Sequence, residues 1–197
     1  MNLRRSRDLP VFGTALIVLA ADQISKYWVR QHLALGVPWD PAQWLRPVLR
    51  FTYVTNTGAA FGILRQLAPV YPFVAVAVIV AILFFYRRLP TDQTLILLSL
   101  GLQLGGAAGN LMDRLASVAK CLPSSFPGLM GLWEALKCAQ VTDFIDLNFW
   151  PLQEWPVFNL ADSSVVVGVC ILALYLFLEE EPSAAFPDHL ADGDEHA

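Results

Sequence analysis

Asp162 is the residue whose position most clearly predicts chemistry in this chain. The stretch 155–178 is apolar, and Asp162 is its only Asp, Glu, Lys, Arg or His. A carboxylate at the centre of a bilayer costs about 2.5–3.5 kcal/mol on insertion scales, so such a group usually lines a polar cavity or a proton path. A second carboxylate, Asp143, lies upstream in the segment that leads to the same stretch.

A pair of close carboxylates can hydrolyse a peptide bond without a nucleophilic side chain. One member keeps a proton, because two adjacent acids cannot both ionise cheaply, and the other acts as a base toward water. Other hydrolase chemistries lack their parts, since the sequence has no GxSxG or HExxH motif. Lys26 could serve a serine–lysine dyad, but Asp22 is its nearer partner. The residues therefore favour an aspartic-type hydrolase.

The composition is that of a membrane protein. The 197 residues are 56% hydrophobic and only 15% charged, with a mean hydropathy of +0.51, whereas soluble domains average about 25% charged. Much of the acid behind the net charge of −4 lies in the tail 181–197, which we expect to be disordered and cytoplasmic. A strongly basic face for nucleic acid is absent.

The apolar stretches predict an all-α membrane protein with four transmembrane helices, because a bilayer core needs about 20 mostly apolar helical residues. A single membrane domain, 1–180, would contain spans at about 10–29, 66–86, 93–112 and 156–178. The first span must include Asp22 and Lys26, which share a helix face and can pair. An alternative for the N-terminus is a cleaved signal peptide, because arginines precede its apolar core.

Four spans place both termini on one side of the membrane. Arg87 and Arg88, together with the arginines near the N-terminus, favour the cytoplasm for that side. The polar segments gather at the opposite ends of the spans. Asp162, expected about five residues into its helix, would lie about 8 Å deep there. Such segregation is expected of a functional site and not of scattered structural residues.

The long loop 30–67 is expected to form a small sheet, an extracytoplasmic β-cradle on the membrane surface. Its residues 50–55 are rich in β-branched and aromatic side chains, which predicts a strand. A turn signal that begins at Asn56 and includes Gly58 follows directly.

The loop after the third span contains an insertion over 117–140. Its second half is expected to form a short amphipathic helix. Cys121 and Cys138 both fall in this segment. They either form a disulfide, if the loop faces an oxidising compartment, or remain free thiols.

Several other polar and small residues have a structural interpretation beside a functional one. Gly101 and Gly105 form a GxxxG pattern, whose expected role is close helix packing. Asn110 and Asn159 could cap helices or hold carboxylates, and their position near the acids favours the second role. Asp146 is expected to be an exposed partner of Asp143.

Two other classes of function remain open at this point. A small membrane carrier could use Asp162 as a proton-relay group, and it would place carboxylates along a path through the membrane. A membrane scaffold without enzymatic activity would tolerate loss of Asp143.

Five motifs in order resemble those of bacterial lipoprotein signal peptidase, also called signal peptidase II. The matching segments are DQISK (22–26), NTGAAFG (56–62), GGAAGNLMDRL (105–115), VTDFIDL (141–147) and FNLADSSVVVG (158–168). The resemblance covers about residues 10 to 178. Five motifs in this order are far more specific than any one alone.

The resemblance implies an aspartic endopeptidase of the bacterial inner membrane, with its site near the periplasmic leaflet. Its substrates would be diacylglyceryl-modified prolipoproteins, cut just before the lipidated cysteine, and globomycin-type peptides would inhibit it. The family's catalytic aspartates fall on Asp143 and Asp162. Positions that bind substrate or support the site fall on Asp22, Lys26, Asn56, Gly58, Asn110, Asp113, Arg114, Asn159 and Ala161. No metal or cofactor is expected, and the protein is expected to be a monomer.

One departure from the family pattern concerns the outer loop. Family members have a much shorter segment between the residues that match Asp113 and Asp143. The extra chain, which carries both loop cysteines, puts in doubt the shape of this loop and how substrate enters.

Overall fold

The computed structural model describes residues 3–58, 65–88, 93–122, 128–152 and 155–179. The predicted tail 181–197 and residues 59–62 of the second motif lie outside this part of the chain. In chain order the elements are α1 (Leu3–His32), β1 (Pro38–Trp39), β2 (Leu49–Asn56), η2 (Arg65–Leu67), α2 (Tyr71–Phe85), η3 (Tyr86–Arg88), α3 (Thr94–Cys121), α4 (Gly128–Leu136), β3 (Val141–Leu147) and α5 (Leu160–Glu179).

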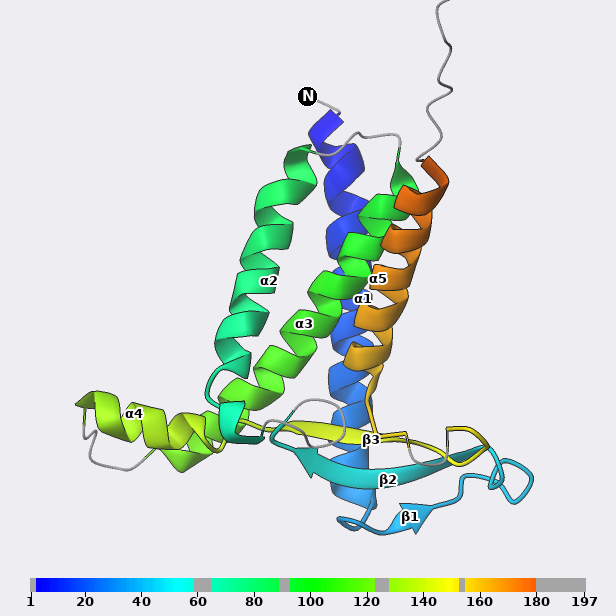
Figure 1. Ribbon diagram of the computed structural model, residues 1–197, viewed down its shortest axis with the longest axis vertical. Coiled ribbons are helices and arrows are strands. Elements are labelled where there is room, and N and C mark those ends of the chain that lie inside the picture. The colour runs from blue at the N-terminus through cyan, green and yellow to red at the C-terminus, as the bar shows by residue number, and fades with distance from the viewer. Residues whose placement is uncertain (1–2, 59–64, 89–92, 123–127, 153–154, 180–197) are drawn as a thin grey trace, which may run out of the picture.

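Four long helices stand side by side, while the sheet and α4 lie across one end of them (Figure 1). The segments long and apolar enough to cross a membrane are Asp8–His32, Tyr71–Arg88, Thr94–Cys121 and Leu160–Leu178. The prediction of four spans is therefore confirmed. The start of α1 and the end of α5 lie together at the end opposite the sheet (Figure 1).

Helix α3 is the centre of the bundle and contacts α1, α2 and α5. Its glycines allow this close packing. A Cβ added at Gly101 would lie 2.7 Å from the carbonyl oxygen of Val11, and one added at Gly105 would lie 2.6 Å from that of Ala15. The expected role of these glycines in close helix packing is confirmed.

The long helices differ in their boundaries from the predicted spans, and α1 extends from Leu3 to His32 where the span was placed at 10–29. Helix α2 begins at Tyr71 instead of 66, because Pro69 disfavours helix in the residue before it and Pro72 suits the first turn. Helix α3 continues past 112 to Cys121, since its last turns pack against the insertion. Helix α5 begins at Leu160 instead of 156, and the extended residues before it are held by the sheet.

The expected β-cradle is present as a three-stranded antiparallel sheet in the order β1-β2-β3. Strand β2, predicted at 50–55, pairs with β3, and Val54 lies opposite Asp143. Phe158 forms an isolated bridge with Ile145 of β3. This bridge ties the chain just before α5 to the strand that carries Asp143.

The insertion folds against the end of α3. Its helix, α4, packs Ala135 and Leu136 against Val118 of α3. The structure pairs Cys121 with Cys138 in a disulfide. The insertion is thus fastened to α3 directly before the chain enters β3.

Candidate active site

Asp143 lies in β3 and is almost fully buried, with 1% of its surface exposed. Both of its oxygens accept hydrogen bonds from side-chain amides. Asn56 Nδ2 lies 3.0 Å from Oδ2, and Asn159 Nδ2 lies 2.6 Å from Oδ1. Loss of hydration on burial, followed by the charge of Asp162, raises the pKa of Asp143 to about 7. Near neutral pH this carboxyl can therefore hold or release a proton.

Asp162 lies in the first turn of α5, where it takes part in a reciprocal helix cap. The backbone N–H of Asp162 donates to Oδ1 of Asn159 over 2.9 Å, and the N–H of Asn159 donates to Oδ2 of Asp162 over 3.3 Å. The expectation that Asp162 lies about five residues into its helix was wrong, because the bridge at Phe158 delays the helix start. The carboxylate instead lies at the helix N-terminus, where the backbone dipoles favour negative charge.

Two asparagines join the aspartates into one unit. Asn159 is fully buried and donates to Asp143 through its side chain and to Asp162 through its backbone. Asn110 Nδ2 donates to Oδ1 of Asp162 over 2.7 Å, and Asn110 Oδ1 accepts from Asn159 Nδ2 over 3.2 Å. The amide groups thus fix both carboxylates relative to each other.

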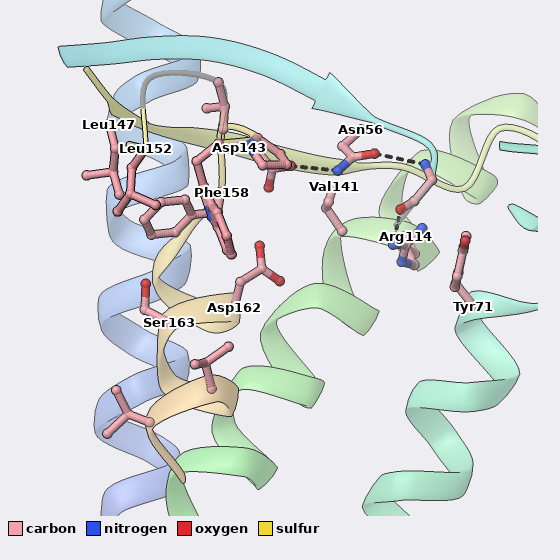
Figure 2. Close-up of a pocket in the computed structure, with 16 residues that line it drawn as sticks. Asn56, Tyr71, Arg114, Val141, Asp143, Leu147, Leu152, Phe158, Asp162 and Ser163 are labelled. Carbon is pink, nitrogen blue, oxygen red and sulfur yellow. Dashed lines mark hydrogen bonds between the residues drawn. The ribbon is translucent and has the colours of Figure 1, made fainter. Parts of the chain in front are cut away.

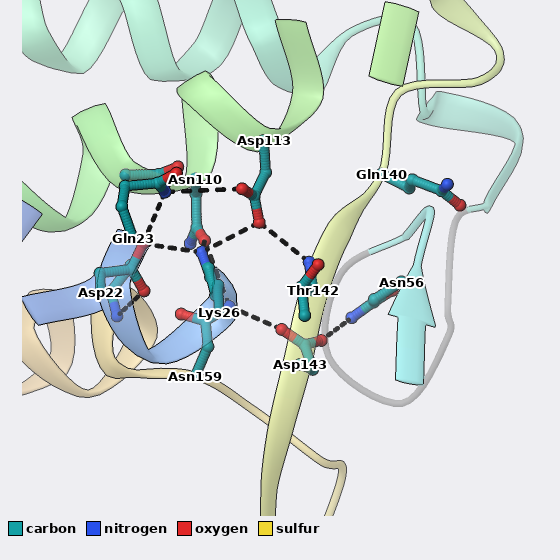
Figure 3. Close-up of polar contacts among 12 residues, drawn as sticks. Asp22, Gln23, Lys26, Asn56, Asn110, Asp113, Gln140, Thr142, Asp143 and Asn159 are labelled. Carbon is teal, nitrogen blue, oxygen red and sulfur yellow. Dashed lines mark hydrogen bonds and ion pairs between the residues drawn. The ribbon is translucent and has the colours of Figure 1, made fainter. Parts of the chain in front are cut away.

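A buried ion-pair network lies directly behind this unit (Figure 3). The ammonium of Lys26, which is 0% exposed, lies 2.8 Å from Asp22 Oδ2 and 3.3 Å from Asp113 Oδ2. It also donates to Asn110 Oδ1 over 2.9 Å, which orients the amide nitrogen of Asn110 toward Asp162. The predicted pairing of Asp22 with Lys26 is confirmed.

The two acids of this network also hold the backbone on which the aspartates are built. The N–H of Ala161 donates to Asp22 Oδ1 over 3.0 Å, and the N–H of Thr142 donates to Asp113 Oδ2 over 3.0 Å. These two residues directly precede Asp162 and Asp143. The network therefore fixes α5 and β3 to the bundle directly beside the two aspartates.

The aspartates face a cavity of about 660 Å³ between the sheet and the ends of the helices nearest to it. Figure 2 shows the carboxyl groups of Asp143 and Asp162 directed toward each other at its wall. Most of the wall is apolar. Its lining residues are Asn56, Gly58, Tyr71, Arg114, Val141, Asp143, Leu147, Leu152, Trp155, Pro156, Val157, Phe158, Asp162, Ser163, Val166 and Val167.

Arg114 supplies positive charge to the same cavity. Its guanidinium lies 4.7 Å from the centre of the Tyr71 ring, and Nη2 donates to the carbonyl oxygen of Gly58 over 3.4 Å. The other terminal nitrogen, Nη1, is buried and has no hydrogen-bond partner within the described part of the chain. Such an unpaired donor beside two carboxylates is suited to an oxygen atom of a ligand.

The structure brings the predicted site residues together in two layers. Five of them line the cavity, namely Asn56, Gly58, Arg114, Asp143 and Asp162. The others lie behind the cavity wall and support it, and Asn159 and Asn110 connect the two layers by hydrogen bonds. Sequence reasoning missed Tyr71, which belongs to no motif. It also missed Gln23, whose side-chain amide donates to Asp22 over 3.1 Å, although Gln23 lies inside the first motif.

Asp146 was wrongly expected to be exposed. It is 8% exposed, accepts a hydrogen bond from Thr52 Oγ1 over 2.6 Å, and lies 3.3 Å from Arg50 Nη2. Residues three apart in a strand point to opposite faces, so Asp146 does not share a face with Asp143. It belongs to the scaffold of the sheet.

Within the described residues, no group of three or more His, Cys, Asp or Glu side chains is arranged to hold a metal ion. The polar groups at this site include two carboxyl groups, three asparagine amides, one guanidinium and the hydroxyl groups of Tyr71 and Ser163. Proton transfer and hydrogen bonding to a polar substrate are within their reach.

Comparison with solved structures supports the fold. One structure described as a bacterial membrane enzyme at 2.3 Å resolution superposes with a TM-score of 0.64 at 24% identity, covering 88% of this chain and 90% of that one. A second, at 1.9 Å resolution, gives a TM-score of 0.62 at 24% identity, with coverage of 85% and 92%. Both share the fold of this chain.

Comparison of sequences identifies the family. A lipoprotein signal peptidase of Moorella thermoacetica is 41% identical over 170 residues, covering 86% of this chain and 94% of its own. One from Halothermothrix orenii is 34% identical over 171 residues, covering 87% and 97%. The profile of the family described as Signal peptidase (SPase) II matches residues 14–178. The chain is therefore a multi-pass membrane peptidase that belongs to the signal peptidase II family.

Proposed function

We propose that this protein removes the signal peptide from diacylglyceryl-modified prolipoproteins by aspartic catalysis, cutting just before the lipidated cysteine. The observation that carries the proposal is the pair Asp143 and Asp162, joined through Asn159 at the wall of one largely apolar cavity. Family membership supports the substrate class. An apolar cavity with a few convergent polar groups suits a lipid-bearing peptide.

The aspartate pair hydrolyses the peptide bond with one shared proton. The ionised carboxylate takes a proton from water as the water oxygen attacks the scissile carbonyl carbon. The protonated carboxyl donates its proton to the carbonyl oxygen, which gives a neutral tetrahedral intermediate. On its collapse the C–N bond breaks, the leaving nitrogen takes a proton from one carboxyl group, and a hydroxyl group of the intermediate returns a proton to the other. A carboxylic acid and an amine are released, and the pair again holds one proton.

The remaining polar groups of the cavity hold the substrate backbone. Arg114 Nη1 is the donor best placed to bind a peptide carbonyl, because it is buried at the cavity and has no partner of its own among the described residues. Apolar side chains near Val166 and Val167 accommodate the acyl chains or the apolar part of the signal peptide. Binding of this kind aligns the scissile bond with the pair.

We place the protein in the bacterial inner membrane as a monomer, with both termini in the cytoplasm and the site at the periplasmic leaflet. Arg87 and Arg88, which favour the cytoplasm, lie at the end of the bundle opposite the sheet. The disulfide between Cys121 and Cys138 lies at the site's end, which fits an oxidising compartment. A globomycin-type peptide is expected to compete for the cavity.

The direct test is cleavage of a diacylglyceryl-modified prolipoprotein by purified protein in detergent, scored as loss of the signal peptide on a gel. Wild type should cut, and Asp143→Asn and Asp162→Asn should be folded but inactive. Asp146→Asn is the matched control, because Asp146 lies on the same strand but outside the cavity lining. Near-normal turnover in either cavity variant would refute the aspartic mechanism.

A proton-coupled carrier remains the alternative function, with Asp162 as its relay group. A carrier would place carboxylates along a path through the membrane, whereas Asp22, Asp113 and Asp162 lie near the same end of the spans. Flux across proteoliposomes that disappears in Asp162→Asn, without peptide cleavage by wild type, would support the carrier instead.

A further inference from the structure

The helix α4 of the insertion has one packed face and one unpartnered face. Its packed face contributes Ala135 and Leu136 to the small core with α3. On the other face Leu129 is 86% exposed, Met130 83% and Trp133 50%. Three large apolar side chains close together on a nine-residue helix form a patch whose exposure to water is unfavourable, so we expect an apolar environment to cover it.

The position of α4 identifies that environment. Figure 1 shows α4 lying across the direction of the spans, beside the sheet-side end of α2. That end of α2 exposes Val70, Phe73 and Val74, as a lipid-facing helix does. Helix α4 therefore lies beside the lipid-facing belt of the bundle.

The length of α3 places α4 at the boundary between hydrocarbon and headgroups. Its 28 residues span about 42 Å at 1.5 Å per residue, whereas a bilayer core is about 30 Å thick. Part of α3 therefore lies outside the hydrocarbon, and we take this part to be its last turns, to which the insertion is fastened by Cys121 and Cys138. Exposed Lys120 on these turns suits the headgroup region.

We propose that α4 is an interfacial anchor, which inserts Leu129, Met130 and Trp133 into the lipid leaflet on the site's side. A short helix with one apolar face lies in the plane of the interface, and tryptophan favours this level of the bilayer. The exposed pair of Glu134 with Lys137 forms the polar edge of the same segment. The occupant of the apolar face is therefore lipid, and the anchor holds the chain that leads into β3 against the membrane surface.

The test compares two positions on α4 in full-length protein reconstituted into phosphatidylcholine and phosphatidylglycerol vesicles. In a Cys170→Ala background, which removes the free thiol and keeps the disulfide, Leu129→Cys and Glu134→Cys are labelled with an environment-sensitive dye. These positions lie about 140° apart around the helix. Quenching is then measured with nitroxide lipids and with aqueous iodide.

Lipid insertion predicts that nitroxide near the headgroup quenches the dye at position 129 severalfold more than the dye at 134, and that iodide shows the reverse order. Equal access of iodide to both positions would overturn the proposal. Shielding at 129 that disappears when the protein is diluted in lipid would assign the face to a second copy and would also overturn it. If neither nitroxide lipids nor iodide quenched the dye at position 129, a protein partner would cover this face. That result would also overturn the proposal.

Discussion

Two replacements of Asn159, by alanine and by serine, distinguish its role in positioning the aspartates from its role in stabilising α5. In Asn159→Ala the helix loses its cap acceptor and Asp143 loses its 2.6 Å hydrogen bond. Loss of an N-cap costs about 1 kcal/mol, and loss of a hydrogen bond to a charged group costs about 1.5–3 kcal/mol. The free energy of unfolding should therefore fall by roughly 2.5–4 kcal/mol.

Asn159→Ser is the informative partner of that variant. Serine is as good an N-cap as asparagine, but it lacks the amide that reaches both Asp143 and Asn110. Stability should thus recover by about 1 kcal/mol relative to the alanine variant. Turnover should stay low, because the unpositioned carboxyl loses about 10- to 150-fold in rate if the same 1.5–3 kcal/mol applies to the transition state.

The assay is steady-state cleavage of a lipid-modified prolipoprotein, with thermal unfolding in the same detergent. The expected pattern is a low kcat with nearly unchanged KM in both variants, and a lower Tm chiefly in Asn159→Ala. Asn148→Ala is a control for the loss of an asparagine amide, because Asn148 lies just after β3 and its exposed hydrogen bond goes to the backbone carbonyl of Arg46. Wild-type kcat in Asn159→Ser would refute the claim that this amide positions the pair.

Three further predictions follow from the geometry. Since the pKa of Asp143 is raised from 3.8 to about 7, cleavage should decline as pH rises above 7 and the pair loses its last proton, and a rate profile that keeps rising to about pH 9 would contradict this. The free energy of unfolding should also decline as pH rises between these two pKa values, and denaturant unfolding that shows no such decline would contradict this second expectation. Removal of the disulfide with Cys121→Ser and Cys138→Ser should weaken the protection of the α4 amides from hydrogen exchange by about 3 kcal/mol, because this is the loop entropy expected for a disulfide of this sequence separation. Unchanged protection would show that packing alone holds the insertion. Gly105→Ala should lower the Tm, because its Cβ would lie 2.6 Å from a carbonyl oxygen of α1. Gly13→Ala is the control and should have little effect, since its Cβ would lie 4.0 Å from the nearest neighbouring atom. Equal Tm values for the two variants would mean that α1 and α3 can move apart at no cost.

Much of the architecture could be predicted because a bilayer imposes simple lengths and polarity on the chain. Long apolar stretches located the four spans, and the four-residue spacing of Asp22 and Lys26 indicated their ion pair. The start of α5 could not be predicted in this way. It depends on Phe158 pairing with Ile145, and a contact between segments separated by a loop leaves no periodic signal in either of them.

The strand that carries Asp143 was also hard to recognise, for a different reason. Its first four residues, from Val141 to Phe144, are all buried, so the alternation of polar and apolar residues that marks a surface strand is missing. Tyr71 offered no signal either, because a tyrosine at the start of an apolar helix is ordinary at a membrane interface. Its place beneath Arg114 becomes visible only when α2 and α3 are packed together.

The buried charges around the site argue for a single proton on the aspartate pair. Lys26 and Arg30 both contact Asp113, and Lys26 also contacts Asp22, so two cations balance two carboxylates behind the site. Among the described residues that line the cavity, Arg114 is the one basic side chain, and its positive charge is not part of this balance. With both Asp143 and Asp162 ionised, the buried cluster would carry a net negative charge, which a low-dielectric site disfavours. With one proton on the pair the cluster is neutral, and under the proposed mechanism the pair then holds both the base that activates water and the acid that protonates the carbonyl oxygen.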